Sequence, residues 1–123
     1  MSIRWTISKQ FHFSASHQLT HLPPEHQCAR LHGHNYLVEV VLSETRLTDD
    51  GFIRDYGELK PLKLYLDNAF DHRHLNSVLG SALDTTAENL ARHLLLWCRA
   101  LWPEVVAVRV SETPSTWAEA RCD

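Results

Sequence analysis

Histidines are the first residues in this sequence that could do chemistry. Nine histidines occur among 123 residues, and six of them lie within the first 34 positions. His32 and His34 are separated only by Gly33. On an extended segment, side chains two residues apart project to the same side, about 6.6 Å apart at the Cα atoms. Two ligands of one metal ion fit this spacing, and Gly33 allows the backbone to bend so that the two rings converge.

His17 is expected to supply a third ligand. It ends the segment of residues 5–17, whose apolar residues share its parity, so this segment is predicted to be a half-buried strand. If the strand pairs antiparallel with the one near His32 and His34, the three rings meet. Three neutral imidazoles leave one position of a tetrahedral Zn²⁺ open, as in catalytic zinc sites. The alternative is that these histidines are ordinary strand-end residues that make hydrogen bonds.

Three cysteines, an odd number, do not form a disulfide framework. Cys28 lies four residues before His32 and could be a fourth metal ligand, a reactive thiol or an inert residue. A nearby cation stabilises a thiolate, which makes Cys28 a candidate base or nucleophile. Cys98 falls on the apolar side of a predicted helix and is expected in the core. Cys122 is expected to be an exposed thiol near the C-terminus.

Two further groups could hold or move protons. Asp71 directly precedes His72, and such a pair can orient an imidazole for proton transfer near neutral pH. The same dipeptide is also common in surface turns. Glu112 shares the parity of the buried face of a valine-rich segment, residues 105–112. A carboxylate there lies either at the wet end of a strand or is desolvated so that it can accept N–H donors from a heterocycle.

The segments between these residues must position them. Residues 18–31 contain Pro23-Pro24 and favour a loop. Apolar residues alternate again over residues 35–44, which predicts a second strand. Asp49-Asp50-Gly51 is a turn signal, and residues 52–56 are expected to return as a short strand in a hairpin or ribbon.

Two helices are expected in the middle of the chain. Leucines at three- and four-residue steps predict the first helix over about residues 57–69. Pro61 requires either that the regular helix begins near Lys60 or that a distorted turn precedes it. The second helix is predicted by a capping-box pattern and by a terminating proline, which are Thr85 with Glu88 and Pro103.

Two more strands are expected at the end of the chain, over residues 105–112 and near residues 117–121. The order strand, strand, helix, helix, strand, strand predicts an α+β domain. Two helices would cover one face of a four-stranded antiparallel sheet. The sheet does not close by itself, so its open edges favour oligomerisation.

Length and charge exclude several classes of protein. A chain of 123 residues suits a single domain, residues 1–123. Twelve basic and fifteen acidic residues give a formal charge of −3, which argues against a nucleic-acid partner. Apolar runs are shorter than the roughly 20 residues of a membrane-spanning helix, and residues 1–5 lack the apolar middle of a signal peptide. We therefore expect a cytoplasmic protein without a membrane partner.

Several of these patterns occur together in one order along nearly the whole chain. In combination the chain resembles the 6-pyruvoyltetrahydropterin synthase family, and most closely its bacterial 6-carboxytetrahydropterin synthase branch in the queuosine pathway. The motifs that carry the resemblance are Phe11-x-Phe13-x-Ala15-x-His17, Leu22-Pro23-x-x-His26-x-Cys28-x-x-Leu31-His32-Gly33-His34, Asp55-Tyr56-x-x-Leu59-Lys60, Phe70-Asp71-His72-x-x-Leu75-Asn76, Thr86-x-Glu88-Asn89 and Glu112-Thr113.

The resemblance implies a tunnelling fold. In this fold, trimers close their sheets into a barrel, two trimers usually stack into a homohexamer, and active sites lie between subunits. Zn²⁺ would be the cofactor. By the matching motifs, the metal ligands would be His17, His32 and His34, the catalytic residues Cys28, Asp71 and His72, and the pterin-binding residues Glu112, Thr85 and Thr86. Cys28 would come from a different subunit than the Asp71-His72 pair.

The resemblance also implies a reaction, in which the substrate is the small molecule 7,8-dihydroneopterin triphosphate. Zinc would bind the hydroxyls of its side chain and stabilise developing negative charge. The Cys28 thiolate would remove the C1′ proton, His72 would exchange a second proton, and Glu112 would fix the ring. Loss of triphosphate and cleavage of the side chain would release acetaldehyde and leave 6-carboxy-5,6,7,8-tetrahydropterin, without a redox cofactor.

Two other functions compete with this interpretation. Within the family, 6-pyruvoyltetrahydropterin synthesis eliminates triphosphate and keeps the carbon chain, although the segment from Leu22 to Cys28 favours the queuosine branch. Outside enzymes, the chain could be a zinc-binding oligomeric module without catalysis. One departure from the family concerns Gln27, which stands where relatives often carry lysine and so offers no charge to the thiolate or the triphosphate.

Overall fold

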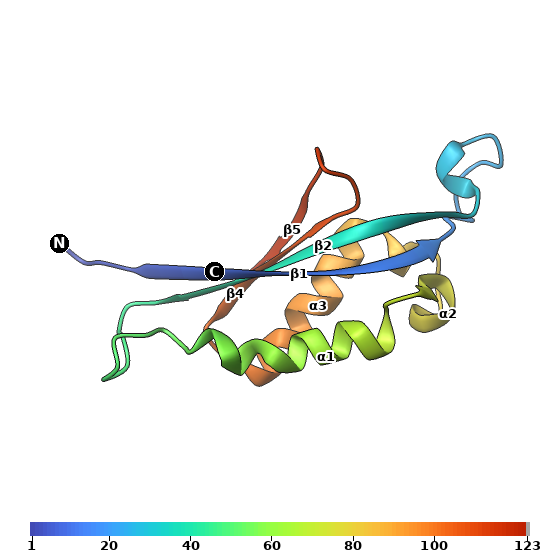
Figure 1. Cartoon of the computed structure of the whole chain (residues 1–123). Helices are drawn as coiled ribbons and strands as arrows, with labels where there is room; N and C mark the ends of the chain where they lie inside the picture. The colour runs from blue at the N-terminus through green and yellow to red at the C-terminus, as the bar shows by residue number, and fades with distance from the viewer. Residues whose placement is uncertain (123) are drawn as a thin grey trace.

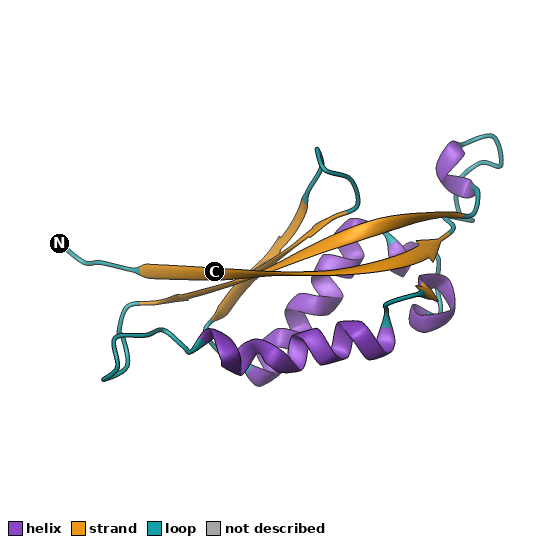
Figure 2. Cartoon of the chain, viewed as in Figure 1, coloured by secondary structure: helices purple, strands orange, loops and turns teal. Residues whose placement is uncertain are grey.

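One mixed β-sheet with helices packed against one of its faces forms the fold (Figures 1 and 2). The computed structural model describes residues 1–122. The strand order is β3-β1-β2-β4-β5, and all neighbours are antiparallel except β3, which is parallel to β1. The strands are β1 (Trp5–His17), β2 (His32–Glu44), β3 (Arg73–His74), β4 (Val105–Ser111) and β5 (Ala118–Arg121). The helices are α1 (Lys60–Ala69), α2 (Leu75–Leu79) and α3 (Ala87–Leu101).

The long two-stranded ribbon of β1 and β2 carries the candidate functional residues at one end. The two strands pair along their whole length, from Trp5 opposite Glu44 to His17 opposite His32. The predicted alternation is confirmed, because the residues of one parity in β1 turn toward the helices and become buried from Phe11 onward. The apolar face of this ribbon therefore ends on histidines.

A single hydrophobic core lies between the sheet and the helices. Phe13 of β1 stacks on Tyr36 of β2, with ring centroids 4.8 Å apart, and also contacts Phe70 after α1. Each fully buried side chain of this size stabilises the fold by about 1.5–3 kcal/mol. Cys98 is completely buried on α3, as predicted. Cys122 is only half-exposed and packs against the core, so its assignment as an exposed thiol is wrong.

A proline in the first turn and a side-chain cap account for where the two long helices begin. A 3₁₀ turn, Tyr56–Leu59, precedes α1, and Pro61 lies in the first turn of α1, where its missing N–H costs nothing. The N-cap of α3 is Thr86, whose side chain accepts from the backbone N–H of Asn89. The predicted capping box is wrong by one residue, because Thr85 still belongs to the preceding 3₁₀ turn, Leu83–Thr85.

The sheet has five strands rather than the four predicted, and it is mixed rather than antiparallel. The additional strand, β3, is only two residues long, too short for a periodicity signal, and the short helix α2 follows it at once. Residues 52–56 do not return as a strand. Phe52 instead closes a turn with Thr48, whose backbone N–H donates to the carbonyl of Phe52. The edge of β2 that does not pair with β1 pairs with β4.

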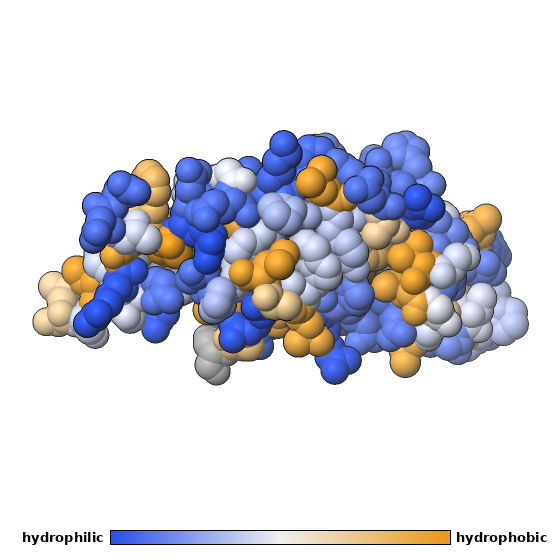
Figure 3. Space-filling model, turned by 90° about the horizontal axis from the view of Figure 1, so that it is seen from below, coloured by the Kyte–Doolittle hydropathy of each residue, from blue (hydrophilic) through white to orange (hydrophobic). Residues whose placement is uncertain are grey.

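The surface formed by the helices is largely hydrophilic, with separate hydrophobic patches (Figure 3). Within residues 1–122, no helix has the length and apolar character needed to cross a bilayer.

Candidate metal centre and active site

Three histidines converge at the end of the β1–β2 ribbon, as the sequence predicts. His17 ends β1, and His32 and His34 begin β2, so antiparallel pairing brings them to the same face. One ring nitrogen from each lies within 4.8 Å of the others. The ring centroids are 4.5 Å apart for His17 and His32, and 4.9 Å apart for His32 and His34. The three residues are therefore positioned to bind one metal ion.

Hydrogen bonds fix which nitrogen of two of these rings is free. The Nδ1 of His17 lies 3.1 Å from the carbonyl oxygen of Thr85, and the Nδ1 of His32 lies 2.7 Å from that of Arg30. A carbonyl can only accept, so both Nδ1 atoms carry the proton and both Nε2 atoms keep their lone pair. Among the described residues, the buried Nε2 atoms of His17 and His34 have no hydrogen-bond partner. Free imidazole nitrogens aimed at a common point form a donor set that Zn²⁺ accepts, so the residues fit the metal.

Burial favours the neutral forms of His17 and His34. The pKa of His17 is lowered to about 4, first by burial and then by the neighbouring rings of His32 and His34. The pKa of His34 is also lowered, by burial and by His32. Only neutral imidazole has the lone pair that a metal needs, so these rings are ready to bind an ion at neutral pH without first losing a proton.

Gly33 lies between the two ligands of β2 on the other face of the sheet. A Cβ atom added there would lie 3.3 Å from the carbonyl oxygen of Ala15, on the neighbouring strand. This contact is tighter than nine in ten Cβ contacts and would push the two strands apart. Gly33 thus allows β1 and β2 to approach closely where the three rings must converge.

Glu112 lies beside the metal ligands, just after the end of β4. Its Oε2 is 3.6 Å from the Nε2 of His34, and about a quarter of its side chain is exposed, 24%. Burial raises the pKa of Glu112, while His32 and the backbone N–H of Ala87 act in the opposite direction. The sequence left open whether Glu112 lies at a solvent-exposed strand end or is a desolvated carboxylate. In the structure its carboxylate is half-buried and lies next to the three histidines.

Asp71 and His72 form the predicted oriented pair. The Oδ2 of Asp71 lies 2.8 Å from the Nδ1 of His72, and its Oδ1 accepts from the backbone N–H of Ser14 at 2.9 Å. The N–H of Ser14 and the His72 ring lower the pKa of Asp71, so the carboxylate stays ionised and His72 must carry its proton on Nδ1. His72 has a φ of 58°, and its side chain is 83% exposed. Its Nε2 is therefore available to a molecule outside this chain.

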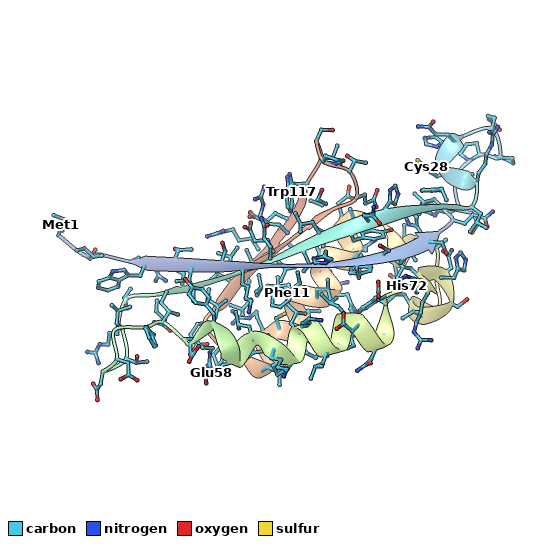
Figure 4. The ribbon with its side chains drawn as sticks, in the orientation of Figure 1. Met1, Phe11, Cys28, Glu58, His72 and Trp117 are labelled. Carbon is cyan, nitrogen blue, oxygen red and sulfur yellow. The ribbon has the colours of Figure 1, made fainter. Side chains whose placement is uncertain are left out.

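Cys28 lies in the 3₁₀ turn Gln27–Ala29, within the loop that joins β1 to β2. It is a free, half-exposed cysteine and is not part of the three-histidine group found among the described residues, so it is not a fourth ligand here. Figure 4 shows Cys28 and His72 on opposite sides of the β1–β2 ribbon. One chain does not bring these two predicted catalytic groups together.

Thr85 and Thr86, predicted near the pterin ring, lie at the start of α3. Thr85 is completely buried, and its hydroxyl donates to Ala82 while lying 3.3 Å from the Nδ1 of His17. Thr86 caps α3. Thr85 therefore contacts the ring of His17 through its backbone carbonyl and its hydroxyl, a contact that sequence reasoning missed because the two residues are 68 positions apart.

The fold and the cluster together define a class of protein, a small α+β domain with three histidines positioned to bind a metal ion at one end of its sheet. The sequence model of the 6-pyruvoyl tetrahydropterin synthase family matches residues 6–123, and the chain belongs to this family.

Relatives and solved structures agree with this assignment. A 6-carboxy-5,6,7,8-tetrahydropterin synthase of Synechocystis sp. is 40% identical over 81 residues, which cover 62% of this chain and 61% of that protein. The enzyme of the same name from Bacillus subtilis is 30% identical over 128 residues, covering 94% of this chain and 84% of that protein.

The 6-pyruvoyl tetrahydropterin synthase structure of Caenorhabditis elegans has a TM-score of 0.82 at 24% identity, with 98% of this chain and 97% of that chain covered. An uncharacterised protein of Wolinella succinogenes has a TM-score of 0.85 at 21% identity, with 99% of this chain and all of that chain covered. At these identities the likeness concerns the fold.

Proposed function

We propose that this protein converts 7,8-dihydroneopterin triphosphate and one water molecule to 6-carboxy-5,6,7,8-tetrahydropterin, acetaldehyde and triphosphate, as a zinc-dependent step of queuosine biosynthesis. The observation that carries the proposal is the cluster of three convergent histidines, His17, His32 and His34, with the Glu112 carboxylate beside it. The relatives named 6-carboxy-5,6,7,8-tetrahydropterin synthase support this product.

The metal would be held by His17, His32 and His34, whose free ring nitrogens converge. When bound, Zn²⁺ at an open three-histidine site would act as a Lewis acid toward oxygen atoms of the substrate. Thr85 and Arg30 supply the carbonyl groups that orient two of the rings, so the ligand set does not have to rearrange on binding.

Glu112 would hold the ring of the substrate. A pterin carries a ring N–H beside an exocyclic amino group, and a carboxylate can accept both hydrogen bonds at once. The half-buried position of Glu112 would make such a pair stronger than it is in water, and a ring held there would lie next to His34. Burial raises the pKa of this carboxyl group, and a pair of N–H donors from the substrate would act in the opposite direction by favouring its ionised form.

Asp71 and His72 would exchange a proton with the substrate. With Nδ1–H bound to Asp71, the Nε2 of His72 can accept or return a proton, and the ionised carboxylate stabilises the imidazolium that forms. Cys28, as a thiolate, would remove the C1′ proton. Because Cys28 and His72 lie on opposite sides of the ribbon, we place the complete site between subunits of a homohexamer, with Cys28 from one chain and Asp71-His72 from another.

The decisive experiment identifies both products. Zinc-loaded protein is incubated with 7,8-dihydroneopterin triphosphate, the pterin is identified by mass spectrometry, and acetaldehyde is trapped as a hydrazone. We expect 6-carboxy-5,6,7,8-tetrahydropterin and acetaldehyde in equal amounts. A 6-pyruvoyl product without acetaldehyde would show that the protein catalyses the other reaction of the family. Unconverted substrate would favour a zinc-binding module without catalysis.

A further inference from the structure

The segment of residues 71–76 runs beside the end of β1 and contacts it at successive positions. At its start, the backbone N–H of His72 donates to the carbonyl of Ser14 at 2.6 Å, and Asp71 accepts from the N–H of Ser14. The two residues of β3 then pair in parallel with Ala15 and Ser16. Asp71 and His72 are thus bonded to the strand that carries His17, three positions before that residue.

Asn76 continues this pairing with its side chain. Its Oδ1 accepts from the backbone N–H of Gln18 at 2.9 Å, and its Nδ2 donates to the carbonyl of Gln18 at 2.7 Å. The backbone has by then turned into α2, which begins at Leu75. A carboxamide carries the same donor and acceptor as a peptide group, so Asn76 replaces the backbone group that the ladder loses there.

The position of Asn76 near the start of α2 does not account for these bonds. The N-cap of α2 is His74, and its side chain makes no capping bond. The backbone carbonyl of Asn76 serves α2, because it accepts from Gly80 at the end of the helix. The carboxamide is instead directed at Gln18, the residue that follows β1, and makes both of its hydrogen bonds there.

His17 lies between two positions that this segment holds, Ser16 in β1 and Gln18 just after the end of β1. On one side, Ser16 pairs with His74 through the backbone and through its hydroxyl, 3.0 Å from the Nδ1 of His74. On the other side, Gln18 is held by Asn76 at both of its backbone groups. The His17 ring itself is bound to Thr85.

We propose that Asn76 is a positioning residue for the metal ligand His17, and that it fixes the offset between this ligand and the Asp71-His72 pair. The inference rests on the proposed function in one respect, the use of the three histidines as metal ligands. A ligand whose backbone is held on both sides loses little entropy on binding, and groups that orient a ligand from outside the coordination shell typically change metal affinity 10–100-fold. Sequence analysis assigned no role to Leu75 or Asn76, although both residues belong to a motif of the family.

The test uses Co²⁺ as a spectroscopic probe of the full chain, with affinity measured by competition against a chelator. N76A is expected to weaken Co²⁺ binding about 10–100-fold and to change the visible absorption bands of the bound ion. Q18A is the matched control, because only backbone groups of Gln18 take part, and it should bind Co²⁺ like the unmodified protein. T48A removes a side-chain hydrogen bond from the distant turn at Phe52 and controls for a general loss of stability.

Should N76A fail to fold, N76D is measured instead. Aspartate keeps the acceptor for the N–H of Gln18 but has no donor for its carbonyl, so Co²⁺ affinity is expected to fall although a negative charge has been added. An N76A or N76D protein that folds and binds Co²⁺ with unchanged affinity and spectrum would overturn the inference. If N76A binds Co²⁺ more weakly and the unmodified protein forms no pterin product, the positioning role of Asn76 is upheld and the proposed reaction is rejected.

Discussion

His17 and His32 lie directly opposite each other on β1 and β2, with their ring centroids 4.5 Å apart. This pairing places the last inward position of one strand against the first position of the next. Only His34 is needed to complete the cluster, and it follows on the same face of β2. The convergence of the three histidines is therefore a product of strand register.

Removing one member of this pair should abolish tight metal binding. H32A leaves two imidazoles, and we expect zinc affinity to fall by more than about 100-fold, since changes outside the coordination shell alone cost 10–100-fold. Zinc content after dialysis and competition with a chelator measure the effect. H12A, on the opposite parity of β1, is the control and should keep its zinc. Full zinc content in H32A would reject the three-histidine site.

The buried hydroxyl of Thr85 should matter for stability as well as for the metal. T85V keeps the shape of the side chain but removes the hydroxyl that donates to the carbonyl of Ala82 at 2.7 Å, and this carbonyl still accepts from the backbone N–H of Thr85 at 3.0 Å. We expect the free energy of unfolding to fall by about 0.5–1.5 kcal/mol in urea, which is the net contribution of one hydrogen bond. T85S, which keeps the hydroxyl, should lie closer to the unmodified protein. Equal stabilities of T85V and the unmodified protein would contradict this role.

A histidine far from the metal centre should make stability depend on pH. His93 on α3 lies 2.7 Å from the Tyr65 hydroxyl, and burial lowers its pKa although Asp84 opposes the shift. As pH falls below about 6.5, the unfolded chain takes up a proton before the folded one does, so this stability is present above that pH and is lost below it.

H93Q should therefore lose less stability than the unmodified protein between pH 7 and pH 5. Urea unfolding of the metal-free proteins at both pH values measures the difference, and the comparison removes the parallel contribution of the metal-centre histidines. Identical pH dependence in both proteins would show that His93 does not titrate differently on folding.

The division of the active site between chains can be tested by mixing inactive variants. C28A and H72A should each lower turnover by at least about 100-fold, because each lacks a group proposed to transfer a proton. If the two residues act from different subunits, unfolding and refolding the variants together should restore about a quarter of the sites, since each site draws its two groups at random. A mixture as inactive as its components would place both residues in the same chain or remove one from the reaction.

Much of the candidate site followed from the sequence because it depends on local periodicity. The parity of residues 5–17 placed His17 on the buried face, and the spacing of His32 and His34 placed both rings on one side of β2. The apolar stripe and the flanking proline of α3 were equally local, although the N-cap was misplaced by one residue. Such patterns are readable because a strand or helix repeats its geometry every few residues.

The remaining features were decided by the tertiary structure. β3 is two residues long, and it exists because β1 offers a free edge beside it. The contacts of His17 with Thr85 and of Gln18 with Asn76 join residues 68 and 58 positions apart. Nothing in a short window of sequence specifies such a contact, because the loops between the partners and the register of the sheet determine which side chains meet. The sequence determined the three candidate ligands and their common face, whereas the packed fold decided which groups orient their rings.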